Sequence, residues 1–469
     1  MPNSVRAKTF FVVTLGCKIN QYESEAIAEA WRGKGLEETG EATGAEVLLV
    51  NSCAVTARAV SDLRAAVRRL RQNNPSARLV VTGCAAQVFR AELAAMPEVD
   101  EVVPQERKDE LLAGPFAKAP SAAACAQTPE APETPAARVF PPFSIAAFRR
   151  ARAVVKVQDG CSHGCTYCIV PLTRGPSVSR QPDEAIAEMR RLLKAGYREL
   201  VVSGVNLRQY GRDLPEPLDF WALLARMEAE LAPEWAGRAR LRLSSLEPAQ
   251  LGPKALDVLG NSRLVAPHLH LSLQSGDAGV LKRMGRGHYR PEQVLDFLRQ
   301  LKTFWPRLGL GADLLTGFPG ESAEQFETTF AFCSELPLTY AHVFPYSPRP
   351  GTAAAKLSDP LPKAARTARA ARLRELAEAR RDAFLQELAG LERLDVLLEY
   401  SGNGQGVCEY YAPCQVLGEC SARPGSLVGV RPQGVEAGRV VGLLAEGQTV
   451  SPQGTQAVSP PISLKGAQA

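Results

Sequence analysis

Short apolar runs alternate with helical patterns over most of this 469-residue chain. Runs of this length are typical of buried strands, and strands that alternate with helices build a parallel sheet covered on both faces. In the first 113 residues the runs are Thr9–Val13, Val47–Val50 and Leu79–Val81, with helical patterns between them at Glu23–Trp31 and Ala59–Leu70. The sequence therefore predicts an N-terminal doubly wound parallel-sheet α/β domain over residues 8–113.

A second series of strands and helices follows a segment that lacks apolar periodicity. That segment, residues 114–145, is rich in Ala, Pro, Thr and Glu and is predicted to be a linker. The expected strands are Val154–Val157, Leu200–Ser203, Leu241–Ser244, His268–Leu273, Leu310–Leu315 and Tyr340–Phe344, and the clearest helix is Asp183–Lys194. Six such units predict an incomplete (β/α)6 barrel within residues 146–390, with its ligand face at the carboxyl ends of the strands.

The C-terminal quarter divides into a charged helix, a glycine-rich β segment and a polar tail. The helix, Leu361 to about Gly390, carries seven basic residues, which indicate either a solvated face or a phosphate-binding surface. Short β-type runs over residues 391–445 predict a small β-barrel. The tail, residues 446–469, is predicted to be disordered.

The chain has eleven cysteines, and their role depends on whether the cellular compartment keeps them reduced. No apolar run is long enough to cross a membrane and no signal peptide is recognisable, so we expect a cytoplasmic protein whose cysteines stay reduced. Metal binding is then the usual role for such cysteines. The net charge of +5 permits a nucleic-acid partner without requiring one.

Three cysteines, Cys161, Cys165 and Cys168, are spaced C-x3-C-x2-C directly after an expected strand. One loop can place these three thiolates around one iron–sulfur cluster and leave its fourth iron without a protein ligand. An open metal position is what catalysis needs. The alternatives are a zinc site with a distant fourth ligand and a chance grouping.

Three further cysteines, Cys17, Cys53 and Cys84, each follow an apolar strand of the N-terminal domain. In a parallel sheet these strand ends share one edge, so the thiols can converge and hold a second cluster. The alternative is three buried free cysteines. Cys125 in the linker and Cys408, Cys414 and Cys420 near the C-terminus have no obvious ligand spacing, and we expect them to be incidental.

The sequence around these cysteines resembles a known family. C-x3-C-x-aromatic-C after the first barrel strand is similar to the radical S-adenosylmethionine (SAM) superfamily. The segments LGCKINQYE (15–23), NSCAVT (51–56) and GCAAQ (83–87) resemble the N-terminal domain of the methylthiotransferases, and YCIVPLTRG (167–175) and FPYSPRPGT (344–352) continue the likeness. The last β segment resembles a divergent TRAM domain, the RNA-binding barrel of this family.

This resemblance implies two 4Fe-4S clusters and SAM as cofactors. The first triad would hold the cluster that chelates SAM and generates a 5′-deoxyadenosyl radical, and the second would carry the sulfur to be transferred. SAM contacts are expected at strand-end positions that match the family pattern: Tyr167, Ser203, Gly204, Asn206, Ser245, Glu247, Gln274, Leu315 and Gly317. No catalytic residue beyond the cluster ligands is expected.

Three substrates occur in this family: isopentenyladenosine in tRNA, threonylcarbamoyladenosine in tRNA, and an aspartate of a ribosomal protein. The N-terminal segments most resemble the threonylcarbamoyladenosine branch, which modifies C2 of the adenosine at position 37 in the tRNA anticodon stem-loop. That branch implies a tRNA partner, an external electron donor and a sulfur source, with no membrane. Different classes remain open: an iron–sulfur redox protein or a zinc-stabilised RNA-binding protein.

Overall fold

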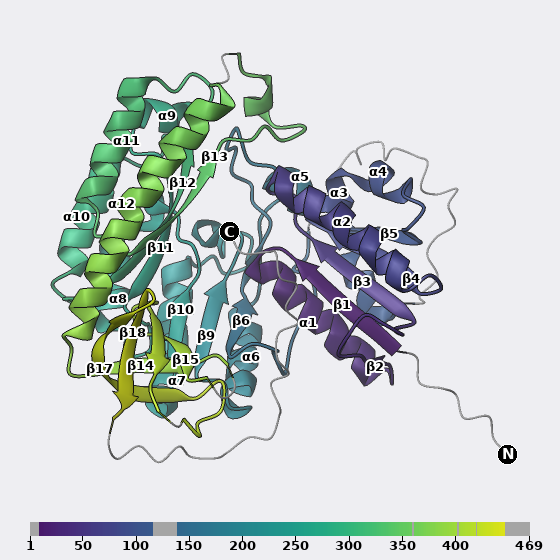
Figure 1. The fold of residues 1–469 in the computed structure, drawn as a ribbon, viewed down its shortest axis with the longest axis horizontal. Coiled ribbons are helices and arrows are strands. Elements are labelled where there is room, and N and C mark those ends of the chain that lie inside the picture. The colour runs from purple at the N-terminus through teal and green to yellow at the C-terminus, as the bar shows by residue number, and fades with distance from the viewer. Residues whose placement is uncertain (1–8, 116–137, 359–360, 401–402, 419, 446–469) are drawn as a thin grey trace.

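The computed structural model describes residues 9–115, 138–358, 361–400, 403–418 and 420–445. An N-terminal α/β domain packs beside a larger barrel, and a small β-barrel lies at one end of the larger one (Figure 1). The predicted disordered tail, Cys125 and most of the predicted linker lie outside the described residues.

The N-terminal domain is the predicted parallel sheet, with five strands in the order β2-β1-β3-β4-β5. Its strands are β1 (Thr9–Leu15), β2 (Glu37–Glu38), β3 (Val47–Ser52), β4 (Arg78–Gly83) and β5 (Glu101–Pro104). Its helices are α1 (Lys18–Gly33), α2 (Ala57–Asn73), α3 (Cys84–Val88), α4 (Arg90–Ala94) and a 3-10 helix over Gln105–Ala113. Neighbouring residues of one strand enter two different cores, as Leu48 and Leu49 of β3 do. Both faces of the sheet are therefore covered, which explains the unbroken apolar runs.

The central domain is an open barrel of six parallel strands, as predicted. Two three-stranded sheets, β6-β9-β10 and β11-β12-β13, are joined by single bridges at Leu241–Val265 and Leu246–Leu271. The strands are β6 (Arg152–Lys156), β9 (Glu199–Ser203), β10 (Arg240–Leu243), β11 (His268–Gln274), β12 (Gly309–Thr316) and β13 (Tyr340–Pro345). A short hairpin of β7 (Gln158–Asp159) and β8 (Val178–Ser179) follows β6. Strands β6 and β13 are the two edges, so the barrel stays incomplete.

Helices cover the outside of the barrel. They are α6 (Pro182–Lys194), α7 (Phe220–Trp235), α8 (Pro253–Asn261), α9 (Ala278–Arg283), α10 (Pro291–Leu301), α11 (Ala323–Glu335) and α12 (Lys363–Ala389). The short helix α5 (Val170–Arg174) packs instead against α3 of the N-terminal domain. Leu269, Leu271 and Leu273 of β11 are fully buried in the core beneath these helices. The alternate residues of the strand are polar and turn to the inside of the barrel.

The N-terminal domain and the barrel share one hydrophobic core. Tyr22 and Trp31 of α1 belong to the same cluster of buried residues as Leu193 of α6. Phe143 and Ile145, at the end of the segment predicted as linker, are buried in this cluster as well. Isolated anchors of this kind have no periodicity, which is why the sequence did not place them in the fold. The shared core fixes one domain against the other.

The C-terminal domain is a closed five-stranded barrel in the order β14-β15-β16-β18-β17. Its strands are β14 (Leu394–Leu398), β15 (Gln405–Cys408), β16 (Pro413–Val416), β17 (Leu427–Glu436) and β18 (Arg439–Leu444). Cys408 and Cys414 are buried side by side in its core, and burial together with their mutual contact raises the pKa of Cys414. Two leucines at the end of α12 complete the core.

Helix α12 uses most of its basic side chains to hold itself to the protein. Arg374 donates to the Val343 carbonyl of β13, Arg380 to the Ser334 carbonyl, and Arg372 pairs with Glu327 of α11. Arg366, Arg369 and Arg381 also contact other elements of the protein. This helix is therefore mainly a strut between the two barrels, and its outer face, with Lys363, Arg372, Arg374 and Arg380, is exposed.

Within the described ranges, no helix combines the length and the apolar character that a membrane span requires.

Candidate active site

Three cysteines of the N-terminal domain lie at the carboxyl ends of adjacent strands. Cys17 follows β1, Cys53 follows β3, and Cys84 follows β4 as the first residue of α3. Because these strands are parallel neighbours, their ends meet at one edge. The thiols lie close enough that burial, together with the charges of Cys17 and Cys84, raises the pKa of Cys53 to about 12. The expected convergence is what the structure describes.

Two glycines allow this approach. Gly16 and Gly83 have φ angles of 148° and 101°, a region that other residues rarely adopt. A Cβ atom on Gly16 would lie 2.9 Å from the Cβ of Cys53, and one on Gly83 would lie 2.3 Å from the carbonyl oxygen of Ser52. A side chain at either position would therefore push the cysteines apart.

The second triad lies in the loop after β7. Cys161, Cys165 and Cys168 line one open pocket together with Leu172 and Gly351. Burial raises the pKa of Cys168 to about 12 and also raises the pKa of Cys165. These three thiols would have to be deprotonated to bind a metal, so the site favours an occupant that supplies positive charge.

Two polar side chains from other barrel loops donate toward the sulfur atoms of this triad. The amide Nδ2 of Asn206 lies 3.5 Å from Cys161 Sγ, and an Arg286 guanidinium nitrogen lies 3.8 Å from Cys165 Sγ. Hydrogen bonds to cluster ligands tune an iron–sulfur centre. Arg286 also pairs with Glu247 at 2.8 Å, which fixes its direction. Sequence reasoning missed Arg286, because a lone arginine in a glycine-flanked loop has no local signature.

A single zinc ion and an iron–sulfur cluster need different spacings of their thiol ligands. Four ligands at the usual Zn–S length of about 2.3 Å would hold the sulfurs about 3.8 Å apart, whereas the ligands of a cluster bind different irons. In the described chain, His270, Asp313 and His342 form the only His/Cys/Asp/Glu group whose ligand atoms all lie within 4.8 Å of one another. Neither cysteine triad forms a group of that kind.

All the residues expected to contact SAM except Tyr167, which lies in the cysteine loop, are at or just after the carboxyl ends of β9 to β12. Ser203 is buried at the end of β9, and a Cβ on Gly204 would lie 2.7 Å from Leu207, so the backbone there is closely packed. Glu247 is buried and receives bonds from Arg286 and His288. Ser245, two residues before Glu247 in the sequence, is exposed.

Tyr167, Leu315 and Gln274 are three further positions at which contacts to SAM are expected. Tyr167 and Leu315 pack against a small apolar cluster that includes Met284 and Phe318. Gln274 has a φ of 71°, a strained conformation for a residue other than glycine, at the end of β11.

Gly317 is crowded, because a Cβ there would lie 2.2 Å from Cγ of Arg366 in α12. Its backbone N–H donates to the Glu321 carboxylate at 2.7 Å. The stem of Arg366 therefore covers this position.

A buried network of charges connects the two cysteine sites. Glu23 of α1 accepts bonds from Lys108 at 2.6 Å, Lys156 at 2.7 Å and Arg174 at 2.8 Å. Asp159 pairs with Lys156 at 2.9 Å and with Arg174 at 2.9 Å. All five side chains are almost fully buried. Apart from Lys156 at the end of the apolar strand β6, nothing in the sequence indicates this network.

Arg174 lies between the two sites. It ends α5, which begins two residues after Cys168, and α5 packs against α3, which begins at Cys84. Its guanidinium also donates to Asn20 Oδ1 at 2.7 Å, and its positive charge acts on Cys84 and Cys53. Arg174 therefore ties α5, which follows the second triad, to the N-terminal triad, and its positive charge favours an anionic group at Cys53 and Cys84.

Comparison with known proteins places these features in a family. Residues 9–104 match an "Uncharacterized protein family UPF0004", and residues 155–333 match the "Radical SAM superfamily". Over 74% of this chain and 77% of the other, the fold is similar to the radical SAM methyltransferase TsrM from Kitasatospora setae, with a TM-score of 0.53 and 14% identity. This likeness shows the radical SAM fold.

Closer relatives are named as tRNA-modifying enzymes. A threonylcarbamoyladenosine tRNA methylthiotransferase MtaB of Rickettsia prowazekii (strain Madrid E) is 35% identical, over 85% of this chain and 89% of the relative. A tRNA-2-methylthio-N(6)-dimethylallyladenosine synthase of Desulfotalea psychrophila (strain LSv54 / DSM 12343) is 32% identical, over 85% and 88%. With the N-terminal domain, the radical SAM barrel and these relatives agreeing over most of its length, this chain belongs to the radical SAM tRNA methylthiotransferases of the MtaB/MiaB type.

Proposed function

We propose that this enzyme adds a methylthio group to C2 of N6-threonylcarbamoyladenosine at position 37 of tRNA. The observation that carries the proposal is the pair of three-thiol sites, one on each side of Arg174. A reaction that breaks a C–H bond and delivers sulfur to the same carbon needs two such centres close together. The MtaB name of relatives such as that of Rickettsia prowazekii supports this substrate over the isopentenyl one.

In this proposal Cys161, Cys165 and Cys168 would hold a 4Fe-4S cluster that binds SAM. The group bound there would supply the one-electron reductive cleavage of SAM. Asn206 and Arg286 hydrogen-bond its sulfur ligands, and the Arg286–Glu247 pair fixes the loop beside it. Tyr167, Ser203, Gly204, Gln274, Leu315 and Gly317 would shape the SAM pocket, with Ser245 at its exposed rim.

Cys17, Cys53 and Cys84 would hold a second 4Fe-4S cluster that carries the sulfur. A second SAM would donate the methyl group, and an external electron donor and an external sulfur source would complete the reaction. The C-terminal barrel would contact the tRNA anticodon stem-loop, whose unpaired bases a protein can reach without opening a duplex. Helix α12 would mainly support that barrel, because its arginines are already engaged within the protein.

The test is turnover by the anaerobically reconstituted protein with SAM, sulfide, a reductant and tRNA that carries threonylcarbamoyladenosine. Nucleoside mass spectrometry should show the methylthio product, and 5′-deoxyadenosine should form with it. The same tRNA with unmodified adenosine, and a tRNA with isopentenyladenosine, serve as matched substrate controls. Product on the isopentenyl tRNA alone would replace the proposed substrate with the alternative one.

Single cysteine variants separate the two sites. Cys161→Ala should abolish both 5′-deoxyadenosine and the methylthio nucleoside. Cys17→Ala should leave 5′-deoxyadenosine formation while the methylthio product disappears. Cys408→Ala is the control, because this cysteine is buried in the C-terminal barrel and should leave the iron content unchanged. A protein that binds no SAM and forms no 5′-deoxyadenosine after full reconstitution would refute the proposed chemistry.

A further inference from the structure

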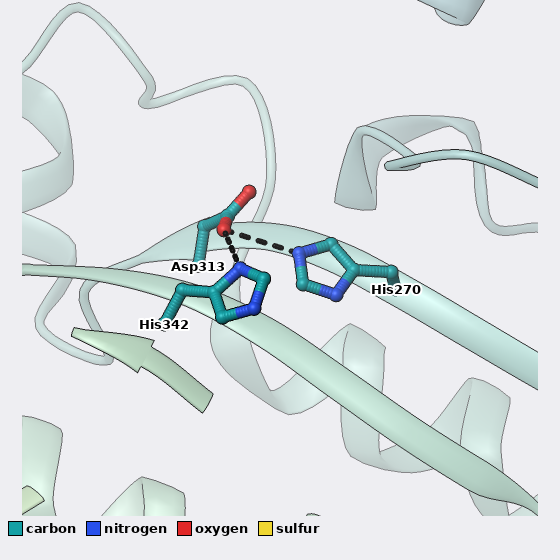
Figure 2. A group of neighbouring side chains, drawn as sticks. All are labelled: His270, Asp313 and His342. Atoms are coloured by element: carbon teal, nitrogen blue, oxygen red, sulfur yellow. Dashed lines mark hydrogen bonds and ion pairs between the residues drawn. The ribbon is translucent and has the colours of Figure 1, made fainter. Parts of the chain in front are cut away.

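Three side chains that can bind metals meet in the middle of the central barrel. His270 lies on β11, Asp313 on β12 and His342 on β13, which are neighbouring parallel strands. Asp313 Oδ1 lies 3.1 Å from His270 Nε2 and 3.3 Å from His342 Nδ1, and both rings turn toward this oxygen (Figure 2). The ligand atoms of all three residues lie within 4.8 Å of one another. One small ion could therefore contact all three side chains at once.

The strand register and one glycine create this convergence. Asp313 and His342 are register partners on β12 and β13. His270 of β11 pairs with Gly311, which lies two residues before Asp313 on the same face of β12. A Cβ atom on Gly311 would lie 2.5 Å from Nδ1 of His270 and 2.1 Å from Cζ of Tyr340. Only a residue without a side chain leaves room for both rings, so Gly311 allows His270 to reach across toward Asp313.

The spacing of the three ligand groups fits the coordination shell of one metal ion. Imidazole and carboxylate ligands lie about 2.0 to 2.2 Å from zinc, so two of them in a tetrahedral shell are about 3.3 to 3.6 Å apart. The two contacts of Asp313, at 3.1 and 3.3 Å, are close to that separation. Two histidines and one carboxylate also form a ligand set that holds zinc or iron(II) in enzymes. Ring protons between these atoms would give similar distances, so the protonation of the histidines matters.

A tyrosine behind the group contacts the far nitrogen of one histidine. The Tyr340 hydroxyl lies 2.9 Å from His270 Nδ1 and 2.9 Å from His268 Nε2. A hydroxyl has a single proton, so when it donates to His268 it accepts from the Nδ1–H of His270. The Nε2 of His270 then presents a lone pair to the Asp313 carboxylate, and a cation between the two removes their repulsion. A partner of this kind on the far nitrogen is typical of histidines that bind metals.

The accessible side of the group faces the inside of the barrel. The residues that flank Asp313 in β12 are buried in the core beneath the helices, so Asp313 itself turns inward. The His342 side chain is 56% accessible, whereas those of Asp313 and His270 are 23% and 9% accessible. Leu315, an expected SAM contact, lies about 7 Å further along the same face of β12 and packs with Tyr167 against one apolar cluster. A metal held here would therefore keep an open coordination position inside the barrel.

We infer that His270, Asp313 and His342 bind one divalent transition-metal ion, with zinc as the expected occupant. Zinc binds a given site of nitrogen and oxygen ligands more tightly than iron(II) does. The open position of such an ion is a Lewis acid that would bind water or an oxygen atom of a substrate. The inference goes beyond the proposed function, because it concerns neither the clusters nor the identity of the nucleoside.

The test loads zinc into the complete enzyme. Anaerobically reconstituted protein is incubated with a slight excess of Zn²⁺ and freed of unbound metal, and zinc and iron are then counted by mass spectrometry. We expect about one bound zinc ion per chain and an unchanged iron content. X-ray absorption at the zinc edge should show nitrogen and oxygen neighbours at about 2.0 to 2.2 Å and no sulfur at about 2.3 Å. This spectrum separates the proposed site from zinc that has entered a cysteine triad.

Three variants locate the ion. His342→Ala should abolish the zinc that nitrogen and oxygen coordinate. Phe344→Ala is the matched control, because it removes an exposed side chain two residues along the same strand and should retain that zinc. Tyr340→Phe should retain the ion but raise the Kd for zinc roughly 10- to 100-fold, because it removes the hydrogen bond that orients His270. Competition with a chromophoric chelator measures this Kd.

The outcomes of this test are independent of tRNA. A wild type that retains no zinc, zinc coordinated by sulfur alone, or the same nitrogen- and oxygen-coordinated zinc in His342→Ala would each overturn the inference. If His342→Ala fails to take up iron, Asp313→Asn replaces it, and the wild-type absorption spectrum still decides. Absence of the methylthio nucleoside from turnover would overturn the proposed function and leave this inference standing.

Discussion

Replacing Glu23 by glutamine should destabilise the enzyme more than any exposed charge change. The Glu23 carboxylate is fully buried and accepts bonds from Lys108, Lys156 and Arg174 at 2.6 to 2.8 Å. Glu23 and Asp159 are the two carboxylates that face these three cations, so the five side chains carry a net charge of +1. Glutamine removes one negative charge, turns two N–H donors toward cations, and leaves Asp159 to balance the three cations alone.

The size of the expected loss of stability follows from the burial of the Glu23 carboxylate. Removing one partner of a buried, hydrogen-bonded ion pair costs about 3–5 kcal/mol, because the remaining charge loses both water and its partner. For a cooperative unit of this size, about 2 °C of melting temperature is lost per kcal/mol. We therefore expect Glu23→Gln to lower the melting temperature by about 6–10 °C. Glu92→Gln is the matched control, because Glu92 pairs with Arg64 on the surface and should cost at most about 1 kcal/mol.

The pH dependence gives a second, independent readout. Burial alone would raise the pKa of Glu23, but the charges of Arg174, Lys108 and Lys156 hold that pKa well below its usual range. The pKa of Asp159 is likewise lowered to about 2. A carboxyl group with a depressed pKa stabilises the fold above its unfolded pKa of about 4 and loses that stabilisation as the pH falls through the folded pKa.

The difference in melting temperature between wild type and Glu23→Gln should therefore be constant from pH 5 to pH 8. It should shrink only when the pH falls below about 4. Differential scanning calorimetry on the metal-free and the reconstituted protein measures it. A loss below about 2 °C at pH 7, or a difference that disappears between pH 5 and pH 8, would refute the view that a buried charge network holds the two cysteine sites together.

Three further variants test other parts of the site. Gly83→Ala should remove the iron of the second cluster while SAM cleavage continues, because the new Cβ would collide with the Ser52 carbonyl 2.3 Å away; iron analysis with 5′-deoxyadenosine yield decides, and full iron retention contradicts it. Arg286→Lys should slow SAM cleavage at least about 10-fold, since a lysine cannot contact Glu247 and Cys165 together; unchanged single-turnover rates would count against it. Glu199→Gln should loosen the C-terminal barrel, because Glu199 orients Arg240 and Arg242, which donate to carbonyls of that domain; limited proteolysis after α12 should then accelerate, and a wild-type digestion rate would refute it.

The fold was predictable where short-range pattern and long-range packing agree. The strands β1, β3 and β4 are apolar because both faces of the sheet are covered, so the sequence located them and the cysteines at their ends. The edge strands β2 and β5 were missed. They are short, and charged residues such as Glu37 and Glu101 interrupt the pattern, as expected for edges that must avoid pairing with other chains.

The connections between the domains were not predictable from sequence. Glu23 and Arg174 are 151 positions apart, and nothing near either residue indicates the other. The basic residues of α12 illustrate the opposite error. Their density suggested either a solvated face or a surface for phosphate, but a count of arginines does not give their direction. Arg374 and Arg380, for example, point back to backbone carbonyls of the barrel.

The C-terminal barrel also covers the amino-terminal end of the central barrel. Tyr411, in the turn between β15 and β16, has a φ of 67° and places its ring 4.6 Å from that of His268 and 5.5 Å from that of Tyr340. The guanidinium groups of Arg152 and Arg242 lie 5.1 Å and 5.0 Å from the same ring. His268, Tyr340 and Arg152 are the first residues of β11, β13 and β6, so the strained turn seals the amino-terminal end of the barrel.

Tyr411→Gly relieves the strain of this turn and removes the ring that packs against His268 and Tyr340. We expect it to loosen the C-terminal barrel, because the contacts of this ring with Arg152 and Arg242 would also be lost. Limited proteolysis after α12 should then be faster than in the wild type, and an unchanged digestion rate would show that the turn does not hold the two barrels together.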